Sequence, residues 1–458
     1  MTTFTDLGLA EPLVRALEAK GYETPTPIQR DAIPIVLTGR DLLGIAQTGT
    51  GKTAAFVLPS IQRLQAAEKR VLPTQVRMLV LAPTRELASQ IAESARGYGR
   101  NSRLSVATVF GGTSINKNRQ DLSRGVDILV ATPGRLIDLV EQGMCNLSMI
   151  EILVLDEADQ MMDLGFIHAL RKIVRMVPRR RQTLFFSATM PTSIRELAAQ
   201  FLHQPETVSV VPASTTAERV DQQVILVNQA EKQALLTMLI QEETIDRALV
   251  FTRTKHGADR VVKLLAGNGI ASNAIHGNKS QGQRERALGE FKSGQVPILV
   301  ATDIAARGID VSGVSHVFNF ELPNVPEQYV HRIGRTARAG ASGVAISFCA
   351  DDERPYLKDI EKLTRLKVPQ RALPEDFMKR GEVLKAARVK AIGNDPAPRE
   401  DRPRGSRPPA RPKATHAPTA TRDYANASRR GGGGAGSGGG RGRGRGGRGR
   451  PASAASAG

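Results

Sequence analysis

A glycine-rich segment near the start of the chain contains the residue types that bind phosphate. Residues 46–53 read AQTGTGKT, between an apolar run and a stretch with helical spacing. Glycines let backbone N–H groups approach phosphate oxygens, and the N-terminus of the following helix adds positive potential. In such a loop Lys52 reaches the β- and γ-phosphates and Thr53 holds Mg²⁺, although an ordinary glycine-rich turn is the alternative. The expected nucleotide contacts are Ala46, Gln47, Thr48, Gly49, Thr50, Gly51, Lys52 and Thr53.

An acidic segment further along supplies the other half of such a site. ILVLDEAD at residues 152–159 places two carboxylates directly after an apolar run. There Asp156 would join the Mg²⁺ shell, and Glu157 would orient or deprotonate the attacking water. Asp and Glu after a strand often only cap the next helix. Their position behind a phosphate loop favours hydrolysis of a nucleoside triphosphate instead.

The elements that must position these residues are short strands alternating with helices. Segments such as 85–98 and 256–268 have helical spacing of Leu, Ile and Ala. Such alternation predicts the α/β class, with parallel sheets that have helices on both faces. Apolar runs predict strands at 42–46, 78–82, 106–110, 128–131, 152–155, 183–186, 223–227, 248–252, 271–275, 298–301, 317–320 and 344–348.

The two series of strands resemble each other. ILVAT occurs at 128–132 and again at 298–302, an offset of 170 residues. Leu-Val-Leu at 79–81 aligns at the same offset with Leu-Val-Phe at 249–251. Because the landmarks recur in one order, the sequence predicts a duplicated domain. We expect two open α/β domains facing a cleft, where ligands bind.

The charge of the chain is unevenly distributed. Of a net charge of +19, the last 78 residues hold +12, with 17 Lys and Arg against 5 Asp and Glu. A basic tail on a nearly balanced body indicates a polyanionic partner, nucleic acid before membrane. Two cysteines exclude a disulfide scaffold and a Cys-rich zinc module. The start resembles no signal peptide and no apolar run reaches ~18 residues, so we expect a soluble, cytoplasmic protein without a membrane partner.

Read with the motifs below, DEAD at 156–159 resembles the DEAD-box RNA helicase family. The match runs from about Phe4 to Val368, with the motifs in the family's order. The resemblance implies two tandem RecA-like domains, ATP and Mg²⁺ as cofactors, and RNA bound without sequence specificity, in structured or duplex form. AIHGNKSQGQRERAL at 274–288, with the basic tail, is similar to the bacterial RhlE-like branch of the family.

GYETPTPIQ at 21–29 resembles the family's adenine-reading motif. An amide such as that of Gln29 donates and accepts at once, which matches adenine's amine and ring nitrogen. Tyr22 can stack on the base, and Phe4 resembles the family's isolated upstream aromatic. The alternative is a proline turn in which Gln29 only caps a helix.

Three further motifs of the first half each follow a predicted strand: PTREL at 83–87, Gly-Gly at 111–112 and TPGR at 132–135. Loops at one edge of a sheet would form a track of amides, hydroxyls and arginines suited to sugar-phosphate. SAT at 187–189 resembles the motif that couples hydrolysis to strand separation, and its hydroxyls are expected to reach Asp159. The resemblance assigns coupling to Asp159, Ser187 and Thr189, and RNA contacts to Pro83, Thr84, Arg85, Gly112, Thr132, Gly134 and Arg135.

In the second half FTRTK, QGQR and ATDIAARGID match the family. The resemblance assigns RNA contacts to Arg253, Gly277 and Thr302, and a contact with the ATP ribose to Asp310.

HRIGRTAR follows, with arginines three residues apart. Arg332, Arg335 and Arg338 would therefore share one helical face, for which a solvated basic surface is the alternative. The resemblance makes Arg335 and Arg338 arginine fingers for the γ-phosphate. Where Ala337 stands, the family usually has glycine.

Together these features predict five segments. They are an adenine-reading segment at 1–30, a first RecA-like ATP-binding domain at 31–210, a linker at 211–219, a second RecA-like domain at 220–380, and a tail at 381–458. The tail is rich in Arg, Gly and Pro, and it cannot bury enough apolar surface to offset the entropy of ordering, so we expect it to be disordered.

We therefore expect an ATP-dependent RNA helicase that closes on ATP and RNA and opens short duplexes. Ribosome assembly or RNA decay is the expected process, with ribosomal precursors or decay proteins as partners. Two other classes remain, an RNA chaperone or clamp with an idle ATPase and a DNA translocase. The complete set of hydrolytic residues argues against the first class. ATP turnover with matched RNA and DNA oligonucleotides distinguishes the second.

Removing residues 381–458 should weaken RNA capture without changing hydrolysis. The tail carries +12, with arginines spaced by glycines from Arg441 to Arg450, so it should act as a tether that raises the local RNA concentration. We expect an unchanged kcat at saturating RNA, a higher RNA concentration at half-saturation, and a salt dependence flattened by ~0.7 per lost phosphate contact. RNA titrations at several salt concentrations test this, and superimposable curves would leave only a solubilising tail.

Overall fold

The computed structural model describes residues 2–47, 49–67, 69–210, 220–306, 309, 311, 313–337, 343–382 and 384. The predicted linker, nearly all of the predicted tail, and the predicted site residues Thr48, Asp310 and Arg338 lie outside this range. The predicted boundaries of the five segments stay predictions. Within the described residues, no helix is both long and apolar enough to cross a bilayer.

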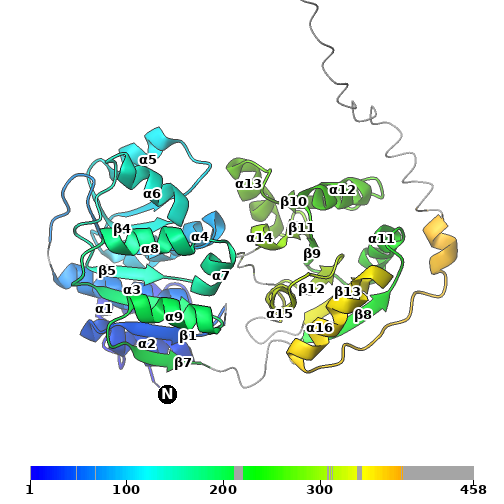
Figure 1. Ribbon diagram of the computed structural model, residues 1–458, viewed down its shortest axis with the longest axis horizontal. Helices are drawn as coiled ribbons and strands as arrows, with labels where there is room; N and C mark the ends of the chain where they lie inside the picture. Colours follow the sequence, from blue (N-terminus) through cyan, green and yellow to red (C-terminus); the bar gives the residue numbers. More distant parts are fainter. Residues whose placement is uncertain are drawn as a thin grey trace, which may run out of the picture. The chain divides into compact units, whose positions relative to one another are not determined.

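The first half forms a parallel sheet with helices on both faces (Figure 1). Its elements in chain order are α1 (Glu11–Glu18), α2 (Pro27–Thr38), β1 (Leu42–Ile45), α3 (Lys52–Ala66), β2 (Val76–Leu81), α4 (Arg85–Tyr98), η1 (Gly99–Asn101), β3 (Val106–Val109), α5 (Ile115–Leu122), β4 (Val126–Ala131), α6 (Pro133–Glu141), β5 (Ile152–Leu155), α7 (Ala158–Asp163), α8 (Ile167–Met176), β6 (Gln182–Ser187), α9 (Thr192–Phe201) and β7 (Glu206–Ser209).

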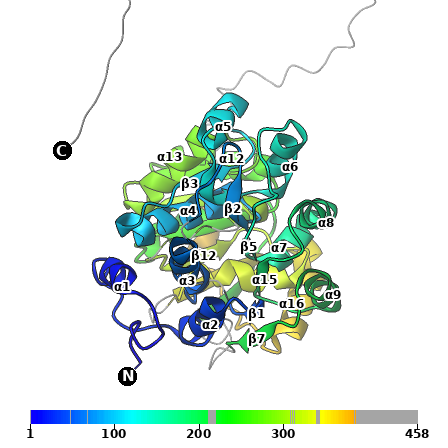
Figure 2. The same ribbon diagram turned by 90° about the vertical axis from the view of Figure 1, so that its left-hand side faces the viewer.

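The strands of this sheet lie in the order β3-β4-β2-β5-β6-β1-β7. Alternate residues of β2 point to opposite faces, with Met78 and Val80 in one apolar cluster and Leu79 and Leu81 in the other. Helices α2, α3 and α4 cover the first face, and α6, α8 and α9 cover the second (Figure 2). Burial on both faces explains why these strands appear in the sequence as continuous apolar runs.

The second half repeats this plan with a sheet in the order β10-β11-β9-β12-β13-β8. Its elements are β8 (Val220–Leu226), α11 (Lys232–Glu242), β9 (Ala248–Thr252), α12 (Lys255–Ala266), β10 (Ser272–Ile275), α13 (Gln281–Lys292), β11 (Ile298–Thr302), α14 (Asp303–Ala306), β12 (His316–Asn319), α15 (Pro326–Ile333), β13 (Gly343–Cys349), η2 (Asp351–Glu353) and α16 (Arg354–Thr364).

The predicted α/β class and the duplication are confirmed. The repeated ILVAT lies on β4 and on β11, which occupy the same place in the two sheets. Helices α4 and α12 begin 170 residues apart, and Thr84 and Thr254 cap them in the same way by accepting a backbone hydrogen bond. The strands of the two halves therefore end in the same arrangement, and equivalent loops follow equivalent strands.

The sequence analysis missed strand β7 and the start of β2. Strand β7 is a four-residue edge strand, ETVS, beside β1, and the β-branched run TVSVV at 207–211 was the signal that would have indicated it. Strand β2 begins at Val76 and includes Arg77, whose side chain is almost fully buried. A charged residue interrupts an apolar pattern, so only the ion pairs that Arg77 makes in the folded chain explain its place.

Candidate nucleotide and RNA site

The predicted phosphate loop connects β1 to α3. Gly51 precedes the helix with a φ of +93°, a left-handed conformation that favours glycine. A Cβ on Gly51 would lie 2.4 Å from Nε2 of Gln29, so side chain and loop approach closely. Lys52 is buried at the start of α3, and its Nζ donates to the carbonyl oxygen of Ala46 at 2.9 Å. The loop thus places an ammonium group among backbone groups at a helix N-terminus, which suits phosphate.

Two carboxylates follow β5 and lie in the same pocket as Lys52. Asp156 and Glu157 are each 2 % exposed, and Glu157 has a φ of +54°, unusual for a residue other than glycine. Burial raises the pKa of the Asp156 carboxyl to about 7; Lys52 opposes this rise and Glu157 adds to it.

The donor set fits Mg²⁺. Oδ1 of Asp156 is buried and has no hydrogen-bond partner within the described part of the chain, and Thr53 lines the same pocket. Among the described residues no three His, Cys, Asp or Glu side chains gather as a metal cluster. Mg²⁺ needs no such cluster, because it is usually held by one or two carboxylates together with phosphate oxygens and water.

The pocket has a volume of about 320 Å³, and the predicted adenine-reading residues lie along it. Gln29 accepts a hydrogen bond from the backbone of Thr26 at 2.9 Å and donates to the carbonyl of Gly51 at 3.2 Å. Phe4 is buried, while Tyr22 is half exposed and its ring lies 6.5 Å from that of Tyr98. The pocket therefore joins an aromatic, amide-bearing end to a phosphate-binding end.

Helix α4 provides pocket residues that sequence reasoning missed. Leu87, Gln90, Ser94 and Tyr98 line the pocket. The spacing of three or four residues places them on one helix face, and this would have been the signal. Apart from Leu87, the last residue of PTREL, no motif marks them, because only the packing of α4 against α3 brings that face to the pocket.

Asp159 joins the carboxylate segment to the loop after β6. Its Oδ2 accepts hydrogen bonds from the backbone of Ala188 and Thr189, at 3.1 and 2.9 Å, and from the Thr189 hydroxyl at 3.0 Å. The contact predicted for Thr189 is present. The hydroxyl of Ser187 donates instead to the carbonyl of Thr189 at 2.7 Å. Hydrogen bonds therefore connect the two loops directly.

The residues predicted to contact RNA in the first half lie at the carboxyl ends of β2, β3 and β4. These strands are neighbours, so their loops meet at one edge of the sheet. A Cβ on Gly112 would lie 2.2 Å from Nη1 of Arg85, and Gly112 has a φ of +84°. Arg135 Nη1 donates to the carbonyl of Thr113 at 2.9 Å. Pro83, Thr84 and Thr132 are buried at the turns, and a Cβ on Gly134 would meet nothing within 4 Å.

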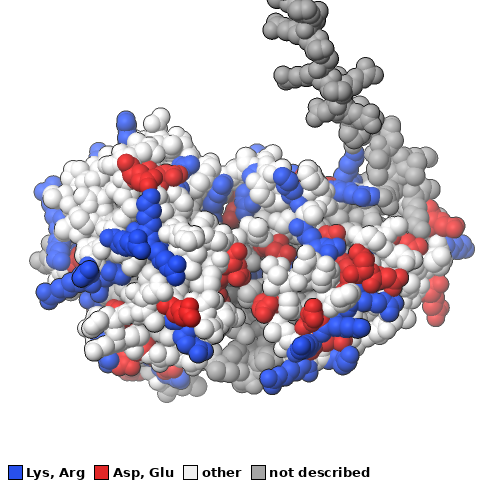
Figure 3. Space-filling view, viewed as in Figure 1, with Lys and Arg blue, Asp and Glu red and all other residues white. Residues whose placement is uncertain are grey.

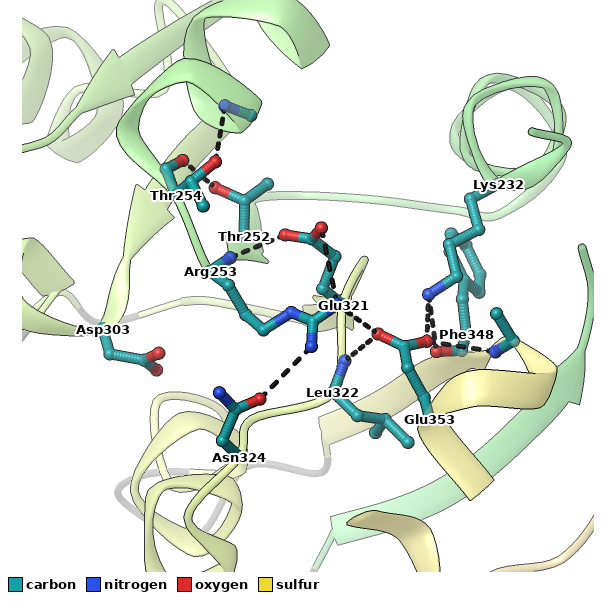
Figure 4. A network of polar contacts seen from close by, with 12 residues as sticks. Lys232, Thr252, Arg253, Thr254, Asp303, Glu321, Leu322, Asn324, Phe348 and Glu353 are labelled. Atoms are coloured by element: carbon teal, nitrogen blue, oxygen red, sulfur yellow. Dashed lines mark hydrogen bonds and ion pairs between the residues drawn. The ribbon is translucent and has the colours of Figure 1, made fainter. Parts of the chain in front are cut away.

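In the second half Arg253 lies within a network of carboxylates (Figure 4). Its Nη2 lies 3.3 Å from Glu353, its Nη1 donates to Asn324 at 3.2 Å, and its backbone N–H donates to Glu321 at 2.7 Å. Lys232 pairs with Glu353 in the same network, and both are fully buried. The contact of Arg253 with RNA stays a prediction. Thr302 ends β11, and Gly277 is exposed beyond β10.

Arg332 and Arg335 of HRIGRTAR do not share one helical face, although the spacing predicted that they would. Helix α15 ends at Ile333, and Gly334 caps it. Arg332 is 1 % exposed and binds both carboxylate oxygens of Asp303, at 2.5 and 2.8 Å. Arg335 lies beyond the helix end, and its Nη1 donates to the carbonyl of Ile309 at 2.9 Å.

Comparisons with known proteins agree with this geometry. The DEAD/DEAH box helicase family matches residues 26–197, and the helicase conserved C-terminal domain matches residues 230–340. The chain belongs to the DEAD-box helicase family. The predicted pair of RecA-like domains and the predicted ATP-dependent RNA helicase activity are thereby confirmed.

Two bacterial relatives of this DEAD-box helicase are similar over most of its length. The chain is 43% identical over 365 residues to the ATP-dependent RNA helicase CshA of Limosilactobacillus reuteri, covering 80% of this chain and 72% of that one. With CshA of Geobacillus kaustophilus it shares 43% over 374 residues, covering 82% and 79%. These relatives carry the name CshA and lend no support to the RhlE-like branch.

Two solved helicases are similar in structure. Dbp5 of S. cerevisiae bound to RNA and ADP BeF3 is 32% identical, with a TM-score of 0.73 over 84% of this chain and 100% of that one. Mss116p bound to ssRNA and AMP-PNP is 26% identical, with a TM-score of 0.75 over 86% and 83%.

Ala337 of this helicase has a φ of +53°, where glycine is favoured. We expect Ala337→Gly to stabilise the protein by about 1 kcal/mol, because it removes the cost of a left-handed conformation. Thermal unfolding should show a rise of a few degrees. Ala266→Gly, at an exposed position in α12, is the control and should be destabilising by up to about 1 kcal/mol. If both substitutions lowered the unfolding temperature equally, the conformation of Ala337 would not be strained.

Asp156→Asn should stabilise the nucleotide-free helicase in a pH-dependent way. The carboxyl has a pKa of about 7 when folded, against an ordinary value of 3.8. Ionisation of this carboxyl therefore destabilises the folded state. Below about pH 4 the destabilisation is absent, between about pH 4 and 7 it grows, and above about pH 7 it is complete. We expect D156N to be more stable by up to a few kcal/mol above about pH 7, with the gain lost toward pH 4.

Thermal unfolding across this pH range checks the prediction, with exposed Asp121→Asn as the control. A difference between D156N and the wild type that does not change with pH would refute it.

Proposed function

We propose that this helicase hydrolyses ATP in the pocket formed by the phosphate loop and the segment after β5. The proposal rests on one observation, that Lys52, Asp156 and Glu157 line the same pocket as Gln29. When bound there by Thr53 and Asp156, Mg²⁺ would neutralise phosphate charge. Lys52 exchanges the Ala46 carbonyl for phosphate oxygens, and Glu157 orients the attacking water and accepts its proton.

At the other end of the pocket, Gln29 reads the adenine edge. Its buried amide already donates and accepts in fixed directions, so it is oriented before the base arrives. Tyr22 stacks on the base and Phe4 closes the apolar end. The rest of the phosphate loop, Ala46 to Thr53, supplies the N–H groups that hold the phosphates, and Asp310 contacts the ribose.

RNA binds along the loops after β2, β3 and β4 through its sugar-phosphate backbone. The contacts are made by Pro83, Thr84, Arg85, Gly112, Thr132, Gly134 and Arg135 in the first half and by Arg253, Gly277 and Thr302 in the second. ATP and RNA each bridge the cleft between the two halves and close it, and the RNA strand bends and leaves its duplex partner. Hydrolysis releases the strand.

The second half completes the ATP site with Arg335 and Arg338, which stabilise charge on the γ-phosphate in the transition state. Coupling between hydrolysis and RNA binding runs through Asp159, Ser187 and Thr189. The three hydrogen bonds to Oδ2 of Asp159 support this, because a movement of the acidic segment must pull on the loop after β6.

The cellular setting rests on the resemblance alone. We propose a cytoplasmic helicase that acts on structured RNA in ribosome assembly or RNA decay, with ribosomal precursors or decay proteins as partners. The RhlE-like assignment rests on residues 274–288 and the basic tail, whereas the relatives are named CshA. ATP turnover with matched RNA and DNA oligonucleotides tests the preference for RNA.

Glu157→Gln tests the hydrolytic assignment. The amide keeps the size and hydrogen bonding of the side chain but loses the charge that accepts the proton. We expect ATP and RNA binding to persist while the single-turnover rate falls by about 10²–10⁴-fold. The control is Glu196→Gln, at an exposed position on α9. Unchanged single-turnover hydrolysis in E157Q would remove Glu157 from the reaction.

A further inference from the structure

A basic hollow of about 950 Å³ lies where strands β2, β4 and β3 begin. It is therefore at the amino-terminal ends of the strands, whereas the nucleotide pocket is at the carboxyl ends of this sheet's strands. The three strands are neighbours, so the segments that lead into them lie side by side. Each segment contributes basic side chains to the hollow. They are Lys69 and Arg70 before β2, Arg103 before β3 and Arg124 before β4.

The carboxylates around this hollow are already paired. Arg77, on its floor, donates to Glu151 at 2.7 Å and lies 3.4 Å from Asp127. Lys69 binds the other oxygen of Glu151 at 2.9 Å. Burial alone would raise the pKa of Glu151, but the hydrogen bonds from Arg77 and Lys69 hold it below its ordinary value. Both acidic charges are therefore neutralised from within the protein.

Three arginines remain available at the rim. Arg70, Arg103 and Arg124 are exposed, and among the described residues none of them pairs with a carboxylate. The visible surface of the same half also carries many Lys and Arg side chains over α8 (Figure 3). The hollow is thus an anion-attracting surface whose own acids do not compete for an incoming ligand.

The rim is held in place by the backbone. Gly125 has a φ of +77°, and a Cβ there would lie 2.2 Å from the carbonyl oxygen of Leu72. The N–H of Gly125 donates to Leu122 at 2.9 Å, and that of Val126 donates to Gln75 at 3.0 Å. Because the loops that carry Arg70 and Arg124 touch, little ordering entropy is lost when a ligand binds.

The chemistry of the lining indicates the ligand class. Guanidinium groups bind phosphate through paired hydrogen bonds. None of the described residues that line the hollow is aromatic, so they offer no platform for unstacked bases and no aromatic anchor for a protein partner. Duplex RNA needs neither, because it is recognised by shape and through its phosphates and 2′-hydroxyls.

We propose that this basic hollow binds the phosphate backbone of an RNA duplex flanking the strand on the RNA-contacting loops. The inference rests on the RNA-binding loops proposed above, at the carboxyl ends of the strands, and extends the RNA-binding surface to their amino-terminal ends. Strand β3 is the edge strand and spans only four residues, about 13 Å. An RNA duplex of about five base pairs covers that distance, because an A-form helix rises by less than the ~3.4 Å per base pair of B-form DNA. The hollow would favour structured RNA over a short single strand.

The full-length chain with Arg70→Gln, Arg103→Gln and Arg124→Gln tests the proposal. The control removes three charges elsewhere, with Arg260→Gln, Lys358→Gln and Lys362→Gln, all exposed in the second half. Two RNAs are compared, a single strand of about ten nucleotides and the same strand joined to a hairpin of about sixteen base pairs. Fluorescence anisotropy gives the Kd at several salt concentrations, and ATP turnover gives kcat for each RNA.

We expect the triple variant to bind the hairpin RNA about tenfold more weakly, with a salt slope flattened by ~2–3. Its Kd for the single strand and its kcat should match those of the control. Equal Kd values for the hairpin RNA in variant and control would overturn the proposal and leave the hollow to another anion, such as an acidic protein segment. Equal losses on both RNAs would also overturn it. Absence of RNA-stimulated turnover in the wild type would instead contradict the proposed function, and the anisotropy comparison would still decide the role of the hollow.

Discussion

Burial of the strands on both faces is the constraint on which the rest of this structure depends. A parallel strand between two layers of helices has no surface on which to present a polar group. Chemistry is therefore confined to the ends, where backbone groups are still available. The phosphate loop follows β1, the acidic segment follows β5, and the loop that binds Asp159 follows β6. These three strands lie side by side in the sheet, in the order β5, β6, β1. One edge of one sheet brings together residues that are more than 100 positions apart in the chain.

The same constraint decides how buried charges are treated. Arg77 lies inside β2 and Lys232 in α11, and each is matched by carboxylates that hold it by direct ion pairs. Such pairs add little net stability, but a lone partner would cost several kcal/mol. Asp156 differs from them, because its buried Oδ1 has no hydrogen-bond partner among the residues that the structure describes and burial raises its pKa. An acid that the protein leaves unsatisfied is suited to a cation that arrives with its ligand.

Backbone strain occurs at two of the functional segments, as it also does at Thr74, Gln204 and Arg365. Glu157 and Ala337 both have positive φ values without being glycine, and both adjoin residues assigned to ATP hydrolysis. Such conformations cost about 1–3 kcal/mol each and persist only where the surroundings impose them. At Glu157 the strain turns the chain sharply between β5 and α7, so that Asp156 and Glu157 can line one pocket while Asp159 points to the next loop.

The sequence by itself determined the α/β class, the duplication and most residues of the nucleotide pocket. Apolar runs and Gly-rich or acidic segments report local chemistry, and the repeated landmarks imply that the two domains share one plan, whereas the order of the strands came from the structure. It did not indicate Arg77 inside β2, because a charge is tolerated there only through Glu151 and Asp127, distant in the chain. It placed Arg332 and Arg335 on one helix, whereas packing buries Arg332 against Asp303 and ends α15 before Arg335. Only the tertiary structure decided that α4 lines the pocket and that three basic segments meet at the opposite edge, because these depend on which faces pack together and not on local sequence.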